Sequence, residues 1–369
     1  MTSPDAPIQI AGAGPAGLAA AICLARAGRC VVVHEAQPRV GARWQGGWQI
    51  IENFSGPEDA LALFDRLGIP VRFAYHPLRA MTVFDGRMRP TAVQSTEPFG
   101  YLIRRGPDTS AVDGGLLAVA QEAGAEVRLG SRVAPEQAVQ IRATGASAAD
   151  GLGCELVFPT ALDDRWQVIL DPHLAPGGYA YLFVFQGWAT IGMAIVRDFK
   201  RLDRCWQATL ERFQALARFS TGDARRSTAY VNFFLPRRLT SNGTLTIGEA
   251  AGFQDDLLGF GIRSAVVSGY LAAQHLLEQQ EYDAAWRSAL EPSQEMGLWL
   301  RYLYERGGRS VARWLIRGAA RTGDVRAYLM RWYRPAWWKR ALLPWIRRRW
   351  AATSPCAHTR VDHWCRRHD

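Results

Sequence analysis

The residues best suited to chemistry near the start of the chain are three glycines and one acid. Gly12, Gly14 and Gly17 lie in the segment GAGPAG, and Glu35 follows Gly17 by 18 residues. In this spacing the glycines permit a tight turn, a close approach to a pyrophosphate and close packing of helix on strand. The pyrophosphate binds at the helix N-terminus, where unpaired N–H groups favour an anion. The Glu35 carboxylate can accept hydrogen bonds from ribose hydroxyls and opposes a 2′-phosphate, so the site suits FAD or NAD rather than NADP.

A second glycine-rich stretch, residues 248–273, reads GEAAGFQDDLLGFGIRSAVVSGYLAA. Glycine weakens regular structure and is favoured where the backbone must pass close to another group. The Glu249 carboxylate suits ribityl hydroxyls, while Gly259 and Gly261 let the next helix point its N–H groups at the flavin N1–C2=O edge. A dehydrogenase that uses NAD has no need of this second loop. The two loops together therefore predict FAD.

These loops need strands and helices that hold them in place. Strands are expected at 8–11, before Glu35 and at 245–247, with a helix of small residues after each loop. Residues 72–99 and 154–240 alternate apolar and polar residues, which predicts a β-sheet. We predict an α/β fold, with a Rossmann-like FAD-binding domain (1–71, 100–153 and 241–290) interleaved with a β-sheet substrate domain (72–99 and 154–240). A helical, basic C-terminal region (291–352) and a tail (353–369) follow.

Residues 7–290 resemble enzymes of the geranylgeranyl reductase group, which have the flavoprotein monooxygenase (p-hydroxybenzoate hydroxylase) fold. Besides the two glycine loops, three segments carry the resemblance: RVGARWQGGWQ (39–49), GYLIRRGPDTSAVDGGLLAVAQEAGAEV (100–127) and PGGYAYLFVFQGWATIGMA (176–194). The first implies that Arg43 lies against the FAD phosphates, and the second that Arg105, or alternatively Arg104, contacts FAD. The cofactor-binding set implied in full is Gly12, Gly14, Ala16, Gly17, Glu35, Ala36, Arg43, Arg105, Val133, Gly145, Gly248, Glu249, Gly259, Gly261 and Ile262.

The third segment is similar to the YxWxFP strand of these reductases. Tyr179, Tyr181 and Phe183 occupy its aromatic places and share one face of a strand. With Trp44 and Trp48 they are candidates for a substrate pocket, and the alternative for each aromatic side chain is simple core packing.

The chain also departs from the pattern of the group. Glu249 replaces an Asp, Asp256 stands where a Pro precedes the loop glycines, and Tyr181 and Val184 replace the Trp and Pro of YxWxFP. The change at Glu249 is mild, and the change at Asp256 bears on the loop over the flavin. The changes at Tyr181 and Val184 bear on the substrate more than on the fold. A second complete GxGxxG is not found, so the electron donor is expected to be NAD(P)H, or another reductant, that is not tightly bound.

The resemblance implies an FAD-dependent oxidoreductase that reduces C=C bonds of an apolar, isoprenoid-like substrate. Hydride is expected from reduced flavin N5, and a proton from water or from Tyr179 or Tyr181. One alternative is a hydroxylase or halogenase that uses a C4a-hydroperoxyflavin. The halogenase version requires a Lys beside the flavin, and Lys200 and Lys339 are the only lysines. A further alternative is a non-catalytic, redox-sensing flavoprotein.

Composition places the chain among globular proteins with a sizeable core, since 48% of its 369 residues are hydrophobic. No apolar run reaches the roughly 18–20 residues of a membrane span, and the first residues do not read as a signal peptide. The six cysteines are scattered. This usage predicts a reduced, cytoplasmic protein.

The basic charge is concentrated at the C-terminal end. From Arg301 onward there are 17 Lys or Arg against 4 Asp or Glu, whereas the preceding residues carry 27 against 30. Seven of the 14 tryptophans also follow residue 300. Residues 295–350 suit peripheral contact with an anionic membrane surface, or helices that pack on the FAD domain with solvated Arg side chains. Nucleic acid is not expected, because the rest of the chain is not basic.

The final segment, CAHTRVDHWCRRHD, contains Cys356, His358, His363 and Cys365. Two thiolates and two imidazoles are a ligand set for tetrahedral Zn, although the spacing is tighter than in the usual zinc fingers. A Cys356–Cys365 disulfide and a frayed tail are the alternatives.

Overall fold

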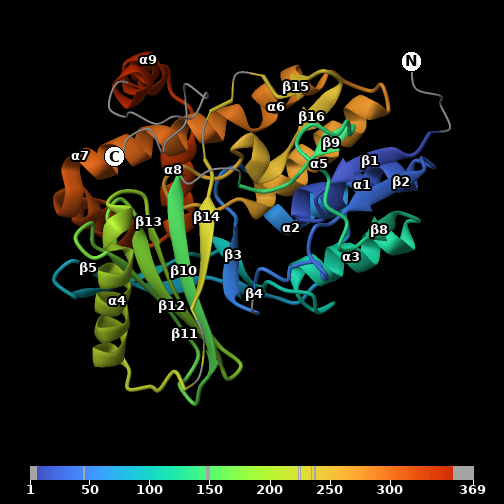
Figure 1. Ribbon diagram of the computed structural model, residues 1–369. Coiled ribbons are helices and arrows are strands. Elements are labelled where there is room, and N and C mark those ends of the chain that lie inside the picture. The colour runs from blue at the N-terminus through green and yellow to red at the C-terminus, as the bar shows by residue number, and fades with distance from the viewer. Residues whose placement is uncertain are drawn as a thin grey trace.

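A computed structural model describes residues 6–44, 46–146, 150–222, 224, 226–233, 235–236 and 238–351. The strands of this part of the chain form three sheets, with helices on their outer faces and a long helix crossing the top of the molecule (Figure 1). Cys356, His358, His363 and Cys365 lie outside the described residues. The predicted α/β fold with a Rossmann-like unit and a helical C-terminal region is confirmed.

The first sheet carries both glycine loops. Its central strands are parallel: β1 pairs with β2 on one side and with β9 on the other, and β9 pairs with β16. Helix α1 leaves β1, and helix α5 packs directly on α1. The strand order is β15 (Thr240–Ser241), β16 (Thr244–Thr246), β9 (Ile141–Arg142), β1 (Ile8–Ala11), β2 (Val31–His34) and β8 (Glu126–Arg128), and the helices are α1 (Pro15–Arg26), α3 (Val112–Glu122) and α5 (Ile262–Leu276).

The second sheet has seven strands and forms the lower half of the molecule in Figure 1. Helix α4 (Leu202–Leu216) covers one face, with Trp206 and Phe213 buried against the strands. Val83, Tyr181 and Phe183 project from the other face and belong to a separate cluster. The strand order is β14 (Ser227–Val231), β10 (Gly151–Pro159), β13 (Trp188–Ile195), β12 (Tyr179–Phe185), β11 (Arg165–Leu170), β5 (Ala80–Asp85) and β6 (Pro90–Gln94).

A third sheet of three strands lies between the other two. It consists of β3 (Trp48–Glu52), β7 (Gly100–Arg104) and β4 (Tyr75–Leu78), and α2 (Ala60–Arg66) follows β3. Trp48, Ile50 and Leu78 from this sheet share a buried cluster with Val83 and Phe183 of the large sheet. Strand β4 lies in the segment predicted for the substrate domain, but it pairs with β7 rather than with the large sheet.

Four helices complete the described chain: α6 (Tyr282–Ala289), α7 (Glu291–Thr322), α8 (Val325–Tyr333) and α9 (Trp337–Ala351). Helix α7 is interrupted at Gly308, whose φ of 50° and ψ of −135° are not helical. Its first half, through Leu298 and Trp299, shares a buried cluster with Phe54, and its second half, through Ile316, joins the cluster beneath the large sheet. Among the described residues, no helix combines the length and the hydropathy required to cross a bilayer.

Candidate active site

The two glycine-rich loops meet at one point of the structure. A Cβ added to Gly248 would lie 2.7 Å from Cβ of Ala16, and one added to Gly269 would lie 2.3 Å from the Ala16 carbonyl oxygen. Some of the glycines in residues 248–273 are therefore required for the close packing of α5 on α1. The same packing brings the second loop beside the first.

Within the first loop, the three glycines have different surroundings. Gly12 has a φ of +103°, and a Cβ there would lie 2.2 Å from the Ala143 carbonyl oxygen. A Cβ on Gly17 would lie 2.0 Å from the Gly12 carbonyl oxygen, as expected for close helix-to-strand packing. Gly14, the N-cap of α1, has no protein atom within 4 Å of such a Cβ, and no side chain caps this end of the helix. The N-terminus of α1 therefore faces open space that a pyrophosphate would fill.

Glu35 lies at the end of β2, directly beside this space. Its carboxylate accepts hydrogen bonds from the backbone N–H groups of Ala13 and Gln37, both at 2.9 Å. These bonds fix the carboxylate at the mouth of the loop and leave it further acceptor capacity for ribose hydroxyls.

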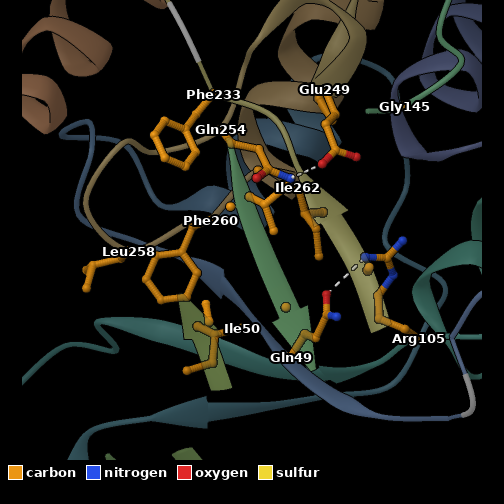
Figure 2. Close-up of a pocket in the computed structure, with 18 of the residues that line it drawn as sticks. Gln49, Ile50, Arg105, Gly145, Phe233, Glu249, Gln254, Leu258, Phe260 and Ile262 are labelled. Carbon is orange, nitrogen blue, oxygen red and sulfur yellow. Dashed lines mark hydrogen bonds between the residues drawn. The ribbon is translucent and has the colours of Figure 1, made fainter. Parts of the chain in front are cut away.

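The second loop presents another acid and another bare helix end. Glu249 Oε1 accepts from Gln254 Nε2 at 3.0 Å, as Figure 2 shows. Burial raises the pKa of the Glu249 carboxyl, and the nearby Arg43 guanidinium opposes that rise. Gly259 has open space around it, whereas a Cβ on Gly261, the N-cap of α5, would lie 2.8 Å from Gln254 Cγ.

Gly145 belongs to the same part of the site. A Cβ built on it would lie 3.6 Å from Glu249 Oε2 and 3.9 Å from Arg43 Nη1. Arg43 is exposed and donates through Nη2 to the Tyr230 carbonyl oxygen at 2.9 Å. An anion and a set of hydroxyls could therefore both be bound here.

Arg105 is held rigidly at the base of the site. Its Nε and Nη2 donate to the two carboxylate oxygens of Asp113, each at 2.8 Å, and its Nη1 donates to Gln49 Oε1 at 3.0 Å. The guanidinium also lies 4.5 Å from the centre of the Trp44 ring. Arg104 points elsewhere, toward Trp48 and Trp188. The geometry favours Arg105 over Arg104 as the cofactor-contacting arginine.

A single cavity of about 820 Å³ joins these parts. Gly17, buried in the helix–strand contact, is the one residue of the expected cofactor set that does not line it. The members that do are Gly12, Gly14, Ala16, Glu35, Ala36, Arg43, Arg105, Val133, Gly145, Gly248, Glu249, Gly259, Gly261 and Ile262.

The cavity continues beneath the large sheet, where its walls become apolar. Tyr179, Tyr181 and Phe183 all line it, and the Tyr181 and Phe183 rings stack at 4.7 Å. The Tyr179 hydroxyl donates to the Leu258 carbonyl oxygen at 2.6 Å. Other apolar side chains of this part include Met81, Val83, Val93, Phe99, Val168 and Leu170.

The two tryptophans proposed for the pocket differ in placement. Trp44 lines the cavity, but Trp48 does not. Trp48 is 5% exposed, packs edge-on against Phe185 at 5.4 Å and donates its indole N–H to the Trp188 carbonyl oxygen. It acts as a core residue between two sheets, because its ring packs on Phe185 and hydrogen-bonds to Trp188, both from the large sheet.

Sequence reasoning missed two contributions to the site. The first is Glu155 on β10, a carboxyl that lines the cavity at 6% exposure. A lone acid within the otherwise apolar run CELVF was the available signal. The second is the wall formed by the C-terminal helices, which includes Leu315, Ile316, Ala319, Tyr328, Leu329 and Trp332.

The residues present fit a flavin dinucleotide. Two uncapped helix N-termini, two carboxylates and Arg43 and Arg105 surround space that no protein atom occupies at Gly14 and Gly259. The described part of the chain contains no group of three His, Cys, Asp or Glu residues able to hold a metal ion.

Comparison with known proteins agrees with this geometry. Residues 10–48 match the model of an NAD(P)-binding Rossmann-like domain. The chain is 26% identical, over 339 residues, to digeranylgeranylglycerophospholipid reductase of Methanosphaerula palustris, which covers 77% of this chain and 79% of the relative.

Two solved structures share the fold. A geranylgeranyl bacteriochlorophyll reductase-like protein of Thermoplasma acidophilum superposes with a TM-score of 0.68 at 18% identity, over 86% of this chain and 92% of that one. PqsL, a probable FAD-dependent monooxygenase of Pseudomonas aeruginosa, gives a TM-score of 0.61 at 15% identity, over 84% and 99%. The resemblance inferred from the sequence is confirmed, and the chain is an oxidoreductase with the fold of the FAD-dependent, geranylgeranyl reductase-like enzymes.

Proposed function

We propose that this protein is an FAD-dependent reductase of C=C bonds in an apolar, isoprenoid-like substrate. The observation that carries the proposal is the single cavity of about 820 Å³, polar at the glycine loops and apolar beneath the large sheet. Its apolar part is lined by aliphatic and aromatic side chains from strands and from helices α7 and α8. Such walls suit a hydrocarbon chain. The curated relative, by its name, acts on a digeranylgeranyl lipid.

Different residues along the cavity would bind the cofactor and orient the substrate. The N-terminus of α1 and Arg43 would bind the pyrophosphate, Glu35 the ribose and Glu249 the ribityl hydroxyls. The bound flavin, once reduced by NAD(P)H or another reductant, supplies the hydride. Phe183, Val83 and their apolar neighbours would orient the alkene and exclude water.

The test is anaerobic reoxidation. Reduced enzyme is mixed, without O₂, with a geranylgeranyl-ether lipid in detergent micelles, and the flavin absorbance and the lipid mass are followed. We expect oxidised flavin and a lipid heavier by two hydrogens for each bond reduced. Reduced flavin that persists after lipid addition would refute the proposal.

A monooxygenase is the competing function, because PqsL shares the fold. It requires substrate-stimulated NAD(P)H oxidation that consumes O₂, which an oxygen electrode measures in the same preparation. The halogenase version is opposed by the lining of the cavity, since neither Lys200 nor Lys339 contributes to it. A redox sensor would show neither activity.

We further propose that α7–α9 hold the enzyme at an anionic membrane surface from the cytoplasmic side. Trp337 is 83% exposed, and Trp338, Leu342 and Trp345 are also exposed on α9. A hollow on α7 is lined by Ser310, Arg313, Trp314, Arg317, Gly318 and Arg321. Its arginines recur every fourth residue and so share one helix face, where they would attract lipid phosphates.

A further inference from the structure

Glu155 and Tyr181 stand in one cross-strand row of the large sheet. Glu155 on β10 pairs with Gly192 on β13, and Gly192 pairs with Tyr181 on β12. Directly opposed residues of neighbouring antiparallel strands project to the same face. The two side chains therefore rise from the same face with only a glycine between them, and both line the cavity.

The glycine between them leaves room for the phenol ring. A Cβ added to Gly192 would lie 2.0 Å from Tyr181 Cζ and 2.2 Å from its hydroxyl oxygen. The ring thus lies across β13, with its hydroxyl on the strand that separates it from Glu155. On its other side the ring stacks on Phe183, with the two ring centres 4.7 Å apart.

Hydrogen bonding separates Tyr181 from two other tyrosines of the cavity, Tyr179 and Tyr304. The Tyr179 hydroxyl donates to the Leu258 carbonyl oxygen, and the Tyr304 hydroxyl donates to the Gly178 carbonyl oxygen. Both hydroxyls therefore have fixed partners. Among the residues that the structure describes, the Tyr181 hydroxyl has no hydrogen-bond partner, so its O–H can turn toward Glu155 or toward a substrate.

Glu155 is buried and incompletely paired. Its Oε1 has no hydrogen-bond partner within the described chain, and both carboxylate oxygens lie 3.0 Å from where a Cβ of Gly47 would be. The groups that face it are Arg105, Gln49, Arg43 and Tyr181. Burial raises its pKa to about 7, with Arg105 opposing the rise, and burial also raises the pKa of the Tyr181 phenol. Near neutral pH, Glu155 is therefore the stronger acid of the two.

We propose that Glu155 and Tyr181 are the acid pair of the site, with the Tyr181 hydroxyl passing the proton of Glu155 across Gly192 to the substrate. The inference deepens the proposed function and depends on it. The alkene π bond breaks as one carbon receives the hydride, with its two electrons, from the reduced flavin. The other carbon receives the Tyr181 proton. The phenolate oxygen takes the proton of Glu155, and the carboxylate regains one from water.

The test compares Glu155→Gln and Tyr181→Phe with the wild type in anaerobic reoxidation by the geranylgeranyl-ether lipid. We expect each variant to slow reoxidation about 100-fold, within the usual range for a lost general acid. Bound FAD and equilibrium lipid binding should stay at wild-type levels. The wild-type rate should fall as pH rises through about 7, and this fall should disappear in Glu155→Gln.

Two further variants complete the experiment. Gly192→Ala keeps both acids but displaces the Tyr181 ring, so it should slow reoxidation to a similar degree. Glu211→Gln, on the exposed face of α4, is the matched control and should leave rate and pH profile unchanged.

The outcomes separate the two proposals. If the wild type reduces the lipid and Glu155→Gln keeps its rate and pH profile, the acid pair is overturned and the reductase stands. If the wild type does not reduce the lipid, the reductase fails first and the acid pair fails with it.

Discussion

The two ends of the cavity are built in different ways. The cofactor end is formed mainly by backbone groups from short, local segments, as at Gly12, Gly14 and Gly259. At the substrate end, side chains from distant strands and from α7 and α8 form the walls. The shape of the cofactor end depends on the backbone conformation of the glycine loops. The shape of the substrate end depends on which side chains pack together there. Substitutions should therefore act by different routes at the two ends.

The largest effect is expected at Gly12. Gly12→Ala would force a side chain onto a φ of +103° and 2.2 Å from the Ala143 carbonyl oxygen. We expect bound FAD to be lost almost completely and the melting temperature to fall, since such strain costs on the order of 1–3 kcal/mol. Flavin absorbance per protein and thermal unfolding measure both.

Gly14→Ala is the matched control for that change. Its Cβ would meet no protein atom within 4 Å, so it should leave the melting temperature of the flavin-free protein unchanged while weakening FAD binding. Full flavin content in Gly12→Ala would contradict this view of the cofactor end.

A smaller effect, on stability, is expected from Glu155 between the two ends. The folded-state pKa of about 7 lies above the unfolded value near 4.5, so its stabilising contribution is complete below pH 4.5 and is lost as pH rises through 7. At pH 8 the loss is at most about 3 kcal/mol. Urea unfolding of the flavin-free protein should show Glu155→Gln more stable than wild type at pH 8. Equal stability at that pH would argue against a raised pKa of the buried Glu155 carboxyl.

Next in size is a substitution at the apolar end. Val83→Phe would fill space beneath the large sheet without touching the glycine loops. We expect bound FAD to be unchanged and lipid-driven reoxidation to slow about tenfold, which corresponds to about 1.4 kcal/mol. Loss of flavin instead would mean that the two ends do not act separately.

The smallest effect is expected outside the cavity, on α9. Trp337→Ala removes a side chain that is 83% exposed, so flavin content and melting temperature should not change. Binding to vesicles of anionic lipid, measured by co-sedimentation, should weaken about threefold, because a partly inserted Trp contributes under 1 kcal/mol. Unchanged vesicle binding would exclude α9 as the contact.

The same contrast explains what could be predicted from the sequence. The first glycine loop could be predicted because its strand, glycines, helix and Glu35 are close together in the chain. Glu155 and the α7–α8 wall were missed because they reach the cavity only through strand register and helix packing. Trp48 was assigned to the pocket because it is close to Trp44 in the sequence, but packing against Phe185 of the large sheet places it in the core.

The break at Gly308 has a consequence for how the two ends are joined. A straight α-helix of 32 residues would extend about 48 Å in one direction. The ψ of −135° at positive φ is open to glycine almost alone, so this one residue lets a single segment turn a corner. The part of α7 after Gly308 places Ile316 and Ala319 at the apolar end of the cavity, while the part before it packs beside the second glycine loop. Gly308 therefore sets the direction of the second half of α7, and the length of that half sets how far the apolar wall of the cavity extends.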